Sequence, residues 1–196
     1  MIYKKKDHYH KKAKDEGFAA RSAYKLQELN KKFNLIRKGN KVLDLGCAPG
    51  AWTQVAAPLV GIDGMVVGID LDKVVIKIPG KNVRFEQKDV FRMKANELPE
   101  APFHVILSDM APRTSGIKVR DQARSVELAL KALELCDELL MTGGSMALKL
   151  FEGEDTHLVT DAIKARFQEL KIFRPQSTRQ ASFEVYMVGL NFKRKD

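Results

Sequence analysis

The sequence has no long uninterrupted run of apolar residues, although 44% of its 196 residues are hydrophobic. A helix that crosses a bilayer needs about 20 apolar residues in a row, so we expect no membrane segment. The first fourteen residues, MIYKKKDHYHKKAK, are charged and have no apolar stretch, which argues against a secretory signal. We therefore expect a cytoplasmic protein that has no membrane partner.

Cysteine is also scarce. The two cysteines, Cys47 and Cys136, fall in a turn motif and in the middle of a predicted helix. Two isolated thiols make neither a disulfide framework nor a zinc site, so we expect reduced thiols and no bound metal. The sequence has no internal repeat and no interdomain linker, and 196 residues suit one domain with a sizeable core.

Positive charge is in excess, because 34 Lys and Arg residues outnumber 25 Asp and Glu residues and give a net charge of +9. Six lysines lie in the first fourteen residues, and three more basic residues lie at 193–195. Such an excess is compatible with a polyanionic partner, although many basic proteins bind no nucleic acid. Because residues 1–16 are charged and have few apolar anchors, we expect a flexible tail there and a single domain at 17–196.

Short apolar runs alternate with amphipathic stretches from Lys41 onward. This alternation predicts a doubly wound α/β fold, with a mainly parallel sheet covered on both faces. The last two runs are joined without a helix, so we expect them to pair as a hairpin and the last strand of a seven-stranded sheet to be antiparallel. The predicted strands are Val42–Leu45, Met65–Ile69, Val83–Phe85, Phe103–Leu107, Ser145–Phe151, Lys171–Phe173 and Val185–Phe192, and the predicted helices are Phe18–Phe33, Trp52–Leu59, Ser125–Met141 and His157–Leu170.

Acidic residues lie at or just after the ends of the first four predicted strands. Ligands of a doubly wound sheet sit beyond the carboxyl ends of its strands, so four carboxylates at equivalent places indicate a binding site. For the third of them, Asp89, a helix N-cap is the competing interpretation. The four residues are Asp44, Asp70, Asp89 and Asp109.

The turn after the first strand reads V-L-D-L-G-C-A-P-G-A-W at residues 42–52. Gly46 and Gly50 allow the backbone to approach a ligand closely, with an ordinary tight turn as the alternative. The turn lacks the G-x-G-x-x-G pattern that cradles a pyrophosphate, which argues against a dinucleotide. Asp70 is placed to accept hydrogen bonds from ribose hydroxyls. The ligand indicated is a nucleoside without a pyrophosphate, and S-adenosylmethionine fits because its two cationic groups suit an acidic pocket.

Lys149 is a lone charge in an apolar strand, S-M-A-L-K-L-F. A lysine in such a place is seldom buried without a partner. It either extends its stem to water at the end of the sheet or acts as a general base. Its candidate partners at other element ends are Lys25, Asp109 and Glu184. The plainer interpretations are an ion pair of Lys25 with Glu28, three residues on, and exposed strand ends for the two acids.

Five motifs in this order resemble those of the FtsJ/RrmJ family of ribosomal RNA large-subunit methyltransferases: R-S-A-Y-K-L, D-L-G-C-A-P-G-A-W, S-D-M-A-P-R-T-S-G, L-K-L-F and E-V-Y. The resemblance covers nearly the whole chain, from about Gly17 to Phe192. It implies a Rossmann-like class I methyltransferase fold, S-adenosylmethionine as the cofactor, and methylation of a ribose 2′-hydroxyl. The family's best-known substrate is a uridine in the A loop of 23S rRNA, so the expected partner is large-subunit rRNA or the assembled large subunit.

The resemblance also implies roles for individual residues. Lys149 is expected to be the general base, and no metal is required because sulfur leaves as a neutral thioether. Burial and the like charge of Lys25 favour a neutral amine on Lys149, whereas Asp109 and Glu184 favour the ammonium, so the sequence leaves the timing of proton transfer open. The implied catalytic set is Lys25, Asp109, Lys149 and Glu184, and the implied cofactor contacts are Gly50, Trp52, Asp70, Asp89 and Asp109.

The chain departs from the family pattern at three places. Ala51 stands where a second glycine is common, and Arg113 stands where asparagine is frequent. Ala181 replaces the arginine of an Arg-Ser-x-Glu motif before the final strand, which removes a possible RNA contact. The alternatives kept open are a tRNA ribose methyltransferase, a non-catalytic RNA-binding module and an NAD oxidoreductase.

Overall fold

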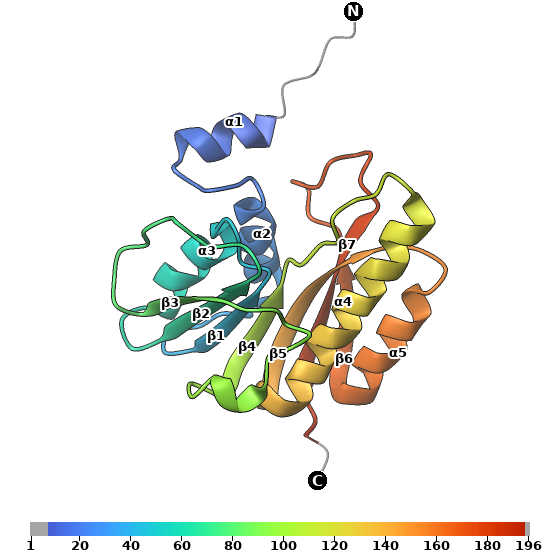
Figure 1. The fold of residues 1–196 in the computed structure, drawn as a ribbon. Coiled ribbons are helices and arrows are strands. Elements are labelled where there is room, and N and C mark those ends of the chain that lie inside the picture. Colours follow the sequence, from blue (N-terminus) through green and yellow to red (C-terminus); the bar gives the residue numbers. More distant parts are fainter. Residues whose placement is uncertain (1–7, 195–196) are drawn as a thin grey trace, which may run out of the picture.

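Seven strands form one sheet whose two faces are covered by helices (Figure 1). The computed structural model describes residues 8–194. The strands are β1 (Lys41–Leu45), β2 (Met65–Asp70), β3 (Val83–Gln87), β4 (Phe103–Ser108), β5 (Leu140–Phe151), β6 (Phe167–Phe173) and β7 (Glu184–Phe192). Their order across the sheet is β3-β2-β1-β4-β5-β7-β6.

The strand directions confirm the predicted sheet. β1 pairs in parallel with β2 and β4, and the outer pairs β2–β3 and β4–β5 are also parallel. β7 is antiparallel to both β5 and β6, so the last two strands form the expected hairpin. Strands inside a parallel sheet are buried on both faces, which is why β1, β2 and β4 are nearly continuous apolar runs.

Helices divide into two groups, one on each face of the sheet. α2 (Ala23–Phe33) and α3 (Ala51–Val60) pack over one face, and α4 (Lys118–Leu139) and α5 (Thr156–Arg166) pack over the other (Figure 1). A short 3-10 helix, η1 (Ala95–Glu97), precedes β4. Within residues 8–194, no helix combines the length and the apolar character that a membrane crossing requires.

The helix predicted at 157–170 is too long. α5 ends at Arg166, and residues 167–170 belong to β6. Phe167 is buried against Phe192 of β7, with ring centroids 5.3 Å apart, and its ring fills the space above Gly189 that a Cβ would occupy. The segment therefore forms a strand despite its helical periodicity, because the strand pairing buries an aromatic ring.

A helix that the sequence did not predict, α1 (His8–Asp15), precedes the domain. It packs on α2: the rings of Tyr9 and Tyr24 lie 5.4 Å apart, and the Tyr24 hydroxyl donates to Glu16 at 2.8 Å. α1 buries only Ala13, so it gives no apolar periodicity for sequence reasoning to detect. Residues 1–7 of the predicted tail lie outside the described residues, and the division into a flexible tail and a domain at 17–196 stays a prediction.

Candidate active site

A cavity of about 310 Å³ lies at the carboxyl ends of β1, β2 and β4. Its wall includes Asp70, Asp89 and Asp109, three of the residues predicted to contact a cofactor. Phe91 borders the same cavity with more than half of its surface exposed, so an apolar ring lies beside the carboxylates. Among the described residues, no group of His, Cys, Asp or Glu side chains is arranged to hold a metal ion.

The two glycines of the first turn have different surroundings. Gly46 lines the cavity with a φ of 74°, and a Cβ there would lie 2.7 Å from the Met110 side chain and 2.9 Å from its backbone. Gly46 therefore allows the end of β1 to pass closely over the segment that follows β4. Gly50, with a φ of 111°, begins α3 and faces Ile76 rather than the cavity.

Asp70 and Asp89 shape the cavity as well as line it. The two carboxylate oxygens of Asp70 accept the backbone N–H groups of Ala48, at 2.8 Å, and Asp72, at 2.9 Å. Asp89 accepts the N–H of Phe91 at 3.0 Å within a turn and lines the cavity, and no described helix begins there, so the alternative interpretation of Asp89 as a helix N-cap is wrong. Both acids keep further lone pairs for a ligand, because a carboxylate offers about four acceptor sites.

Trp52 lies away from the cavity, although the family resemblance implies a cofactor contact. Its ring is only 2% exposed, and its Nε1 donates to the carbonyl of Ser22 at 2.9 Å. It packs against Tyr186 with ring centroids 5.6 Å apart. Trp52 therefore fixes the beginning of α2 beneath the catalytic cluster, and of the predicted cofactor residues only Gly50 and Trp52 are absent from the cavity wall.

Asp44, the first of the four acids predicted to form the binding site, is completely buried and does not line the cavity. Its Oδ2 accepts a hydrogen bond from the Thr53 hydroxyl at 2.6 Å, while its Oδ1 has no hydrogen-bond partner. Burial raises the pKa of Asp44 from 3.8 to about 7, against the opposing effect of the Thr53 bond and with help from the charges of Asp109 and Asp70. This carboxyl is therefore available to change protonation near neutral pH.

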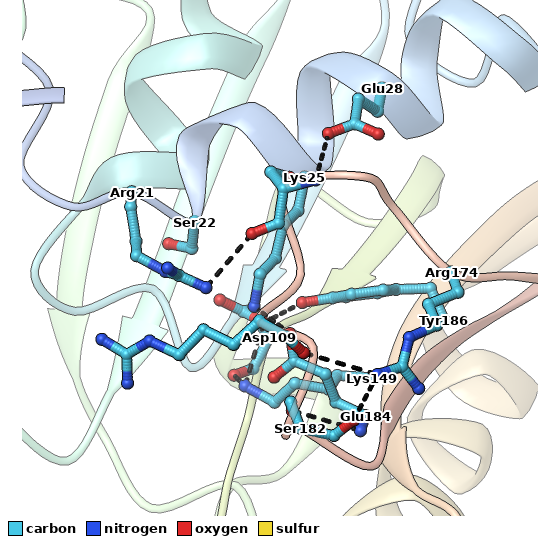
Figure 2. Close-up of polar contacts among 12 residues, drawn as sticks. Arg21, Ser22, Lys25, Glu28, Asp109, Lys149, Arg174, Ser182, Glu184 and Tyr186 are labelled. Atoms are coloured by element: carbon cyan, nitrogen blue, oxygen red, sulfur yellow. Dashed lines mark hydrogen bonds and ion pairs between the residues drawn. The ribbon is translucent and has the colours of Figure 1, made fainter. Parts of the chain in front are cut away.

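The four predicted catalytic residues meet in two ion pairs (Figure 2). Lys149 Nζ lies 2.9 Å from Asp109 Oδ1 and also donates to the Asp109 backbone carbonyl. Lys25 pairs with Glu184, and the two lysines are 9% and 6% exposed. Lys149 does not extend to water, so the snorkelling interpretation is wrong.

The antiparallel pairing of β5 and β7 explains why these residues meet. Lys149 lies opposite Tyr186, and Phe151 lies opposite Glu184, so the carboxyl end of β5 adjoins the beginning of β7. Asp109 follows β4, the other neighbour of β5. Lys25 comes from α2, which covers this end of the sheet (Figure 2).

Tyr186 is a member of the cluster that sequence reasoning missed. Its hydroxyl donates to Asp109 Oδ1 at 2.9 Å, and its ring centroid lies 5.8 Å from Lys25 Nζ. Burial raises the pKa of the Tyr186 hydroxyl well above its usual value, so the phenol remains a donor. The sequence signal is that Tyr186 ends the E-V-Y motif, two residues after Glu184, but a tyrosine in an apolar strand resembles an ordinary core residue.

Glu28 also differs from the interpretation made from sequence. The described contacts do not pair it with Lys25; its carboxylate instead accepts the backbone N–H groups of Gln176, at 2.6 Å, and Ser177, at 3.0 Å. A second pocket, of about 600 Å³, lies beside this contact and shares Lys25 and Glu184 with the catalytic cluster. The cluster thus contributes Asp109 to the first cavity, and Lys25 and Glu184 to the second pocket.

Comparison with known proteins gives a consistent result. The FtsJ-like methyltransferase family model matches residues 18–192. Ribosomal RNA large subunit methyltransferase E of Nitratidesulfovibrio vulgaris strain Miyazaki F is 48% identical over 96% of this chain and 95% of its own length. The protein of the same name from Myxococcus xanthus is 47% identical over 96% of this chain and 90% of its own length. The crystal structure of a ribosomal RNA methyltransferase from Plasmodium falciparum superposes with a TM-score of 0.78 at 29% identity, covering 91% of this chain and all of that one.

Proposed function

The chain belongs to the FtsJ-like methyltransferase family, and from this premise we propose that it methylates a ribose 2′-hydroxyl of large-subunit ribosomal RNA, with S-adenosylmethionine as the methyl donor. The nucleotide proposed is a uridine in the A loop of 23S rRNA, the best-known substrate of the family. One observation carries the proposal: Lys149 is buried and paired with Asp109, and Asp109 also lines the acidic cavity.

The residues of the cavity fit S-adenosylmethionine. The carboxylates of Asp70, Asp89 and Asp109 suit a ligand with ribose hydroxyls and two cationic groups. The exposed apolar surface of Phe91 and Leu71 at the rim suits the face of a base. When bound, this cofactor supplies an electrophilic methyl group on sulfur, and the sulfur leaves without charge.

The protein's own residues then align the ribose oxygen and remove its proton. Lys149 is the general base: it takes the proton of the 2′-hydroxyl as the O–H bond breaks and that oxygen bonds to the methyl group. The Asp109 carboxylate, at 2.9 Å, and the Asp109 carbonyl are both placed to stabilise the resulting ammonium. Lys25, oriented by Glu184, lies on the side from which the ribose approaches. Much of the rate enhancement comes from this alignment.

Nucleotide-resolution mapping of ribose methylation, on rRNA and tRNA from cells with and without the gene, tests the proposal. We expect one mark on large-subunit rRNA, at a uridine of the A loop, to disappear with the gene and to return when the purified enzyme is added with S-adenosylmethionine. Loss of a tRNA mark instead would favour the tRNA alternative. An unchanged methylation pattern would overturn the proposal.

A further inference from the structure

The second pocket is cationic and opens onto the catalytic cluster. Its wall includes His10, Arg21, Lys25 and Arg179, and Glu184 is the acid among the residues that line it. It shares Lys25 and Glu184 with the cluster but none of the carboxylates of the cofactor cavity. A polyanion that delivers a hydroxyl to Lys149 would therefore meet positive charge on this side.

One wall of the pocket is the β6–β7 loop, residues 174–183, which contains no helix or strand. Glu28 of α2 and Arg21, which precedes α2, nevertheless hold the start of this loop by three bonds. Glu28 accepts the N–H groups of Gln176 and Ser177, and Arg21 Nη2 donates to the Ser177 carbonyl at 3.1 Å. Ser177 and Thr178 are buried at this attachment, so the loop has a fixed inner side.

The far end of the loop is held by Arg174 (Figure 2). Its Nη2 donates to the carbonyl of Ser182 and lies 3.4 Å from the carbonyls of Arg179 and Gln180. Arg179 is exposed and lies between the two attachments, at the wall of the pocket. The backbone that carries this guanidinium is thus fixed before any substrate arrives.

We propose that the β6–β7 loop is a preorganised contact for the RNA backbone, in which Arg179 binds a phosphate next to the target nucleotide and Glu28 is the positioning residue that fixes Arg179. The inference rests on the proposed function, because it takes the substrate to be RNA. A guanidinium matches the geometry of a phosphate by paired hydrogen bonds. Prior ordering of the loop removes an entropy loss from the binding step.

Arg179→Ala tests the phosphate contact. With large ribosomal subunits from cells that lack the gene as substrate, we expect KM for the subunits to rise about tenfold, because a charge-assisted hydrogen bond is lost. We expect kcat and the affinity for S-adenosylmethionine to stay within about twofold. The slope of log K against log salt should decrease by about 0.7–0.9, which corresponds to one phosphate. Lys193→Ala, which removes a charge beyond the end of β7, is the matched control and should change none of these.

Moving the positive charge by two residues sharpens the test. Ala181 lines the same pocket wall as Arg179, so the double variant Arg179→Ala/Ala181→Arg keeps one guanidinium on that wall. We expect it to recover KM to within about threefold of wild type, and to restore the salt slope. Failure of this variant to recover any RNA affinity would contradict a phosphate contact at this wall.

Glu28→Ala tests the positioning role. It should raise KM and reduce the salt slope as Arg179→Ala does, and the two substitutions together should be no worse than Arg179→Ala alone, since both act through one contact. Glu127→Ala, a change at an exposed acid of α4, is the control. If Glu28→Ala proves unstable, Glu28→Gln replaces it in the test. Glu28→Gln keeps one carbonyl acceptor, so we expect a partial effect on KM and on the salt slope. Additive effects, or lower thermal stability without a change in the salt slope, would overturn the positioning role.

The inference and the proposed function fail in different ways. If wild-type enzyme methylates the subunits but Arg179→Ala keeps the wild-type KM and salt slope, the phosphate contact is wrong and the function stands. If wild-type enzyme transfers no methyl group to the subunits, the proposed function is wrong and the inference falls with it.

Discussion

The two hollows to which the catalytic cluster contributes residues have opposite charge. The cofactor cavity is lined by four aspartates, 70, 72, 89 and 109, against Lys88 and Arg113. The second pocket is lined by His10, Arg21, Lys25 and Arg179 against Glu184 alone. The first hollow suits a cationic nucleoside and the second suits a polyanion, so under the proposed function the two ligands would be separated by charge.

The boundary between the hollows explains the composition of the cluster. Asp109 lines the acidic cavity, whereas Lys25 and Glu184 line the cationic pocket. Lys149 and Tyr186 line neither and connect the two sides through Asp109. A methyl group that approaches from one side and a hydroxyl that approaches from the other would meet beside Lys149.

Of the substitutions considered, replacement of Lys149 should have the largest effect on the rate of methyl transfer. Lys149→Ala should reduce single-turnover methyl transfer by about 10³-fold or more, within the range for a lost general base. Both ligands should still bind, because each hollow keeps its own charges. Lys149→Arg keeps the charge but does not accept a proton at neutral pH, so it should be nearly as inactive. Lys164→Ala, an exposed lysine of α5, is the control, and substantial activity in the arginine variant would show that Lys149 serves only as a charge.

The residues differ in how far sequence could place them. Lys149 was detectable because a charge inside an apolar run is unusual, and the strand-end position of Asp109 followed from the alternating pattern. The contacts of Tyr186 and Glu28 could not be predicted, because they join each residue to residues 77 and at least 148 positions away. Trp52 shows the limit of the family resemblance, since the resemblance implies a cofactor contact but the ring is buried among core residues and does not line the cavity.

The pH dependence of stability reports whether the buried carboxyl of Asp44, near the cofactor cavity, is protonated in the folded protein. Because burial raises its pKa to about 7, the native state retains this proton from about pH 4 to pH 7 while the unfolded state loses it. Wild type therefore loses stability as pH rises through that window, and Asp44→Asn does not. Between about pH 4 and pH 7, the unfolding free energy of wild type should therefore fall by a few kcal/mol relative to that of Asp44→Asn, since each pKa unit is worth about 1.4 kcal/mol. Urea titrations from pH 4 to pH 8 measure it, and a difference that does not vary with pH would show that Asp44 is ionised throughout.

Asp70→Ala should weaken the binding of S-adenosylmethionine in the acidic cavity without affecting the binding of RNA. The substitution removes the acceptors for the Ala48 and Asp72 N–H groups as well as those proposed for the ribose. We expect the affinity for S-adenosylmethionine to fall about 10- to 100-fold, since bonds to a charged group are worth about 1.5–3 kcal/mol. Calorimetry measures this change, and Asp63→Ala, an exposed acid before β2, is the control. RNA affinity should be unchanged, and a parallel loss of RNA affinity would mean that the two hollows are not independent.

Tyr186→Phe should have the smallest effect on activity. It tests whether the hydrogen bond from Tyr186 to Asp109 connects the cationic pocket to the acidic cavity. The phenylalanine ring keeps the packing on Trp52 and the contact with Lys25, so the cationic side should be intact. Only the hydroxyl bond to Asp109 is lost, which leaves Lys149 as the remaining side-chain partner of Asp109 Oδ1 among the described contacts. A hydrogen bond of this kind contributes about 1 kcal/mol, so we expect kcat to fall about fivefold.

Trp52→Phe supplies the matching change on the other side. It removes the indole donor to the Ser22 carbonyl and so loosens the beginning of α2, which carries Lys25. Its effect should appear in KM for the ribosomal subunits, whereas the effect of Tyr186→Phe should appear in kcat, because Asp109 acts on Lys149 rather than on the RNA. Steady-state kinetics of the two variants with the same subunits separates these outcomes. If both variants changed KM and kcat in the same proportion, the aromatic pair of Trp52 and Tyr186 would only stabilise the fold. It would then have no separate effects on RNA binding and on the chemical step.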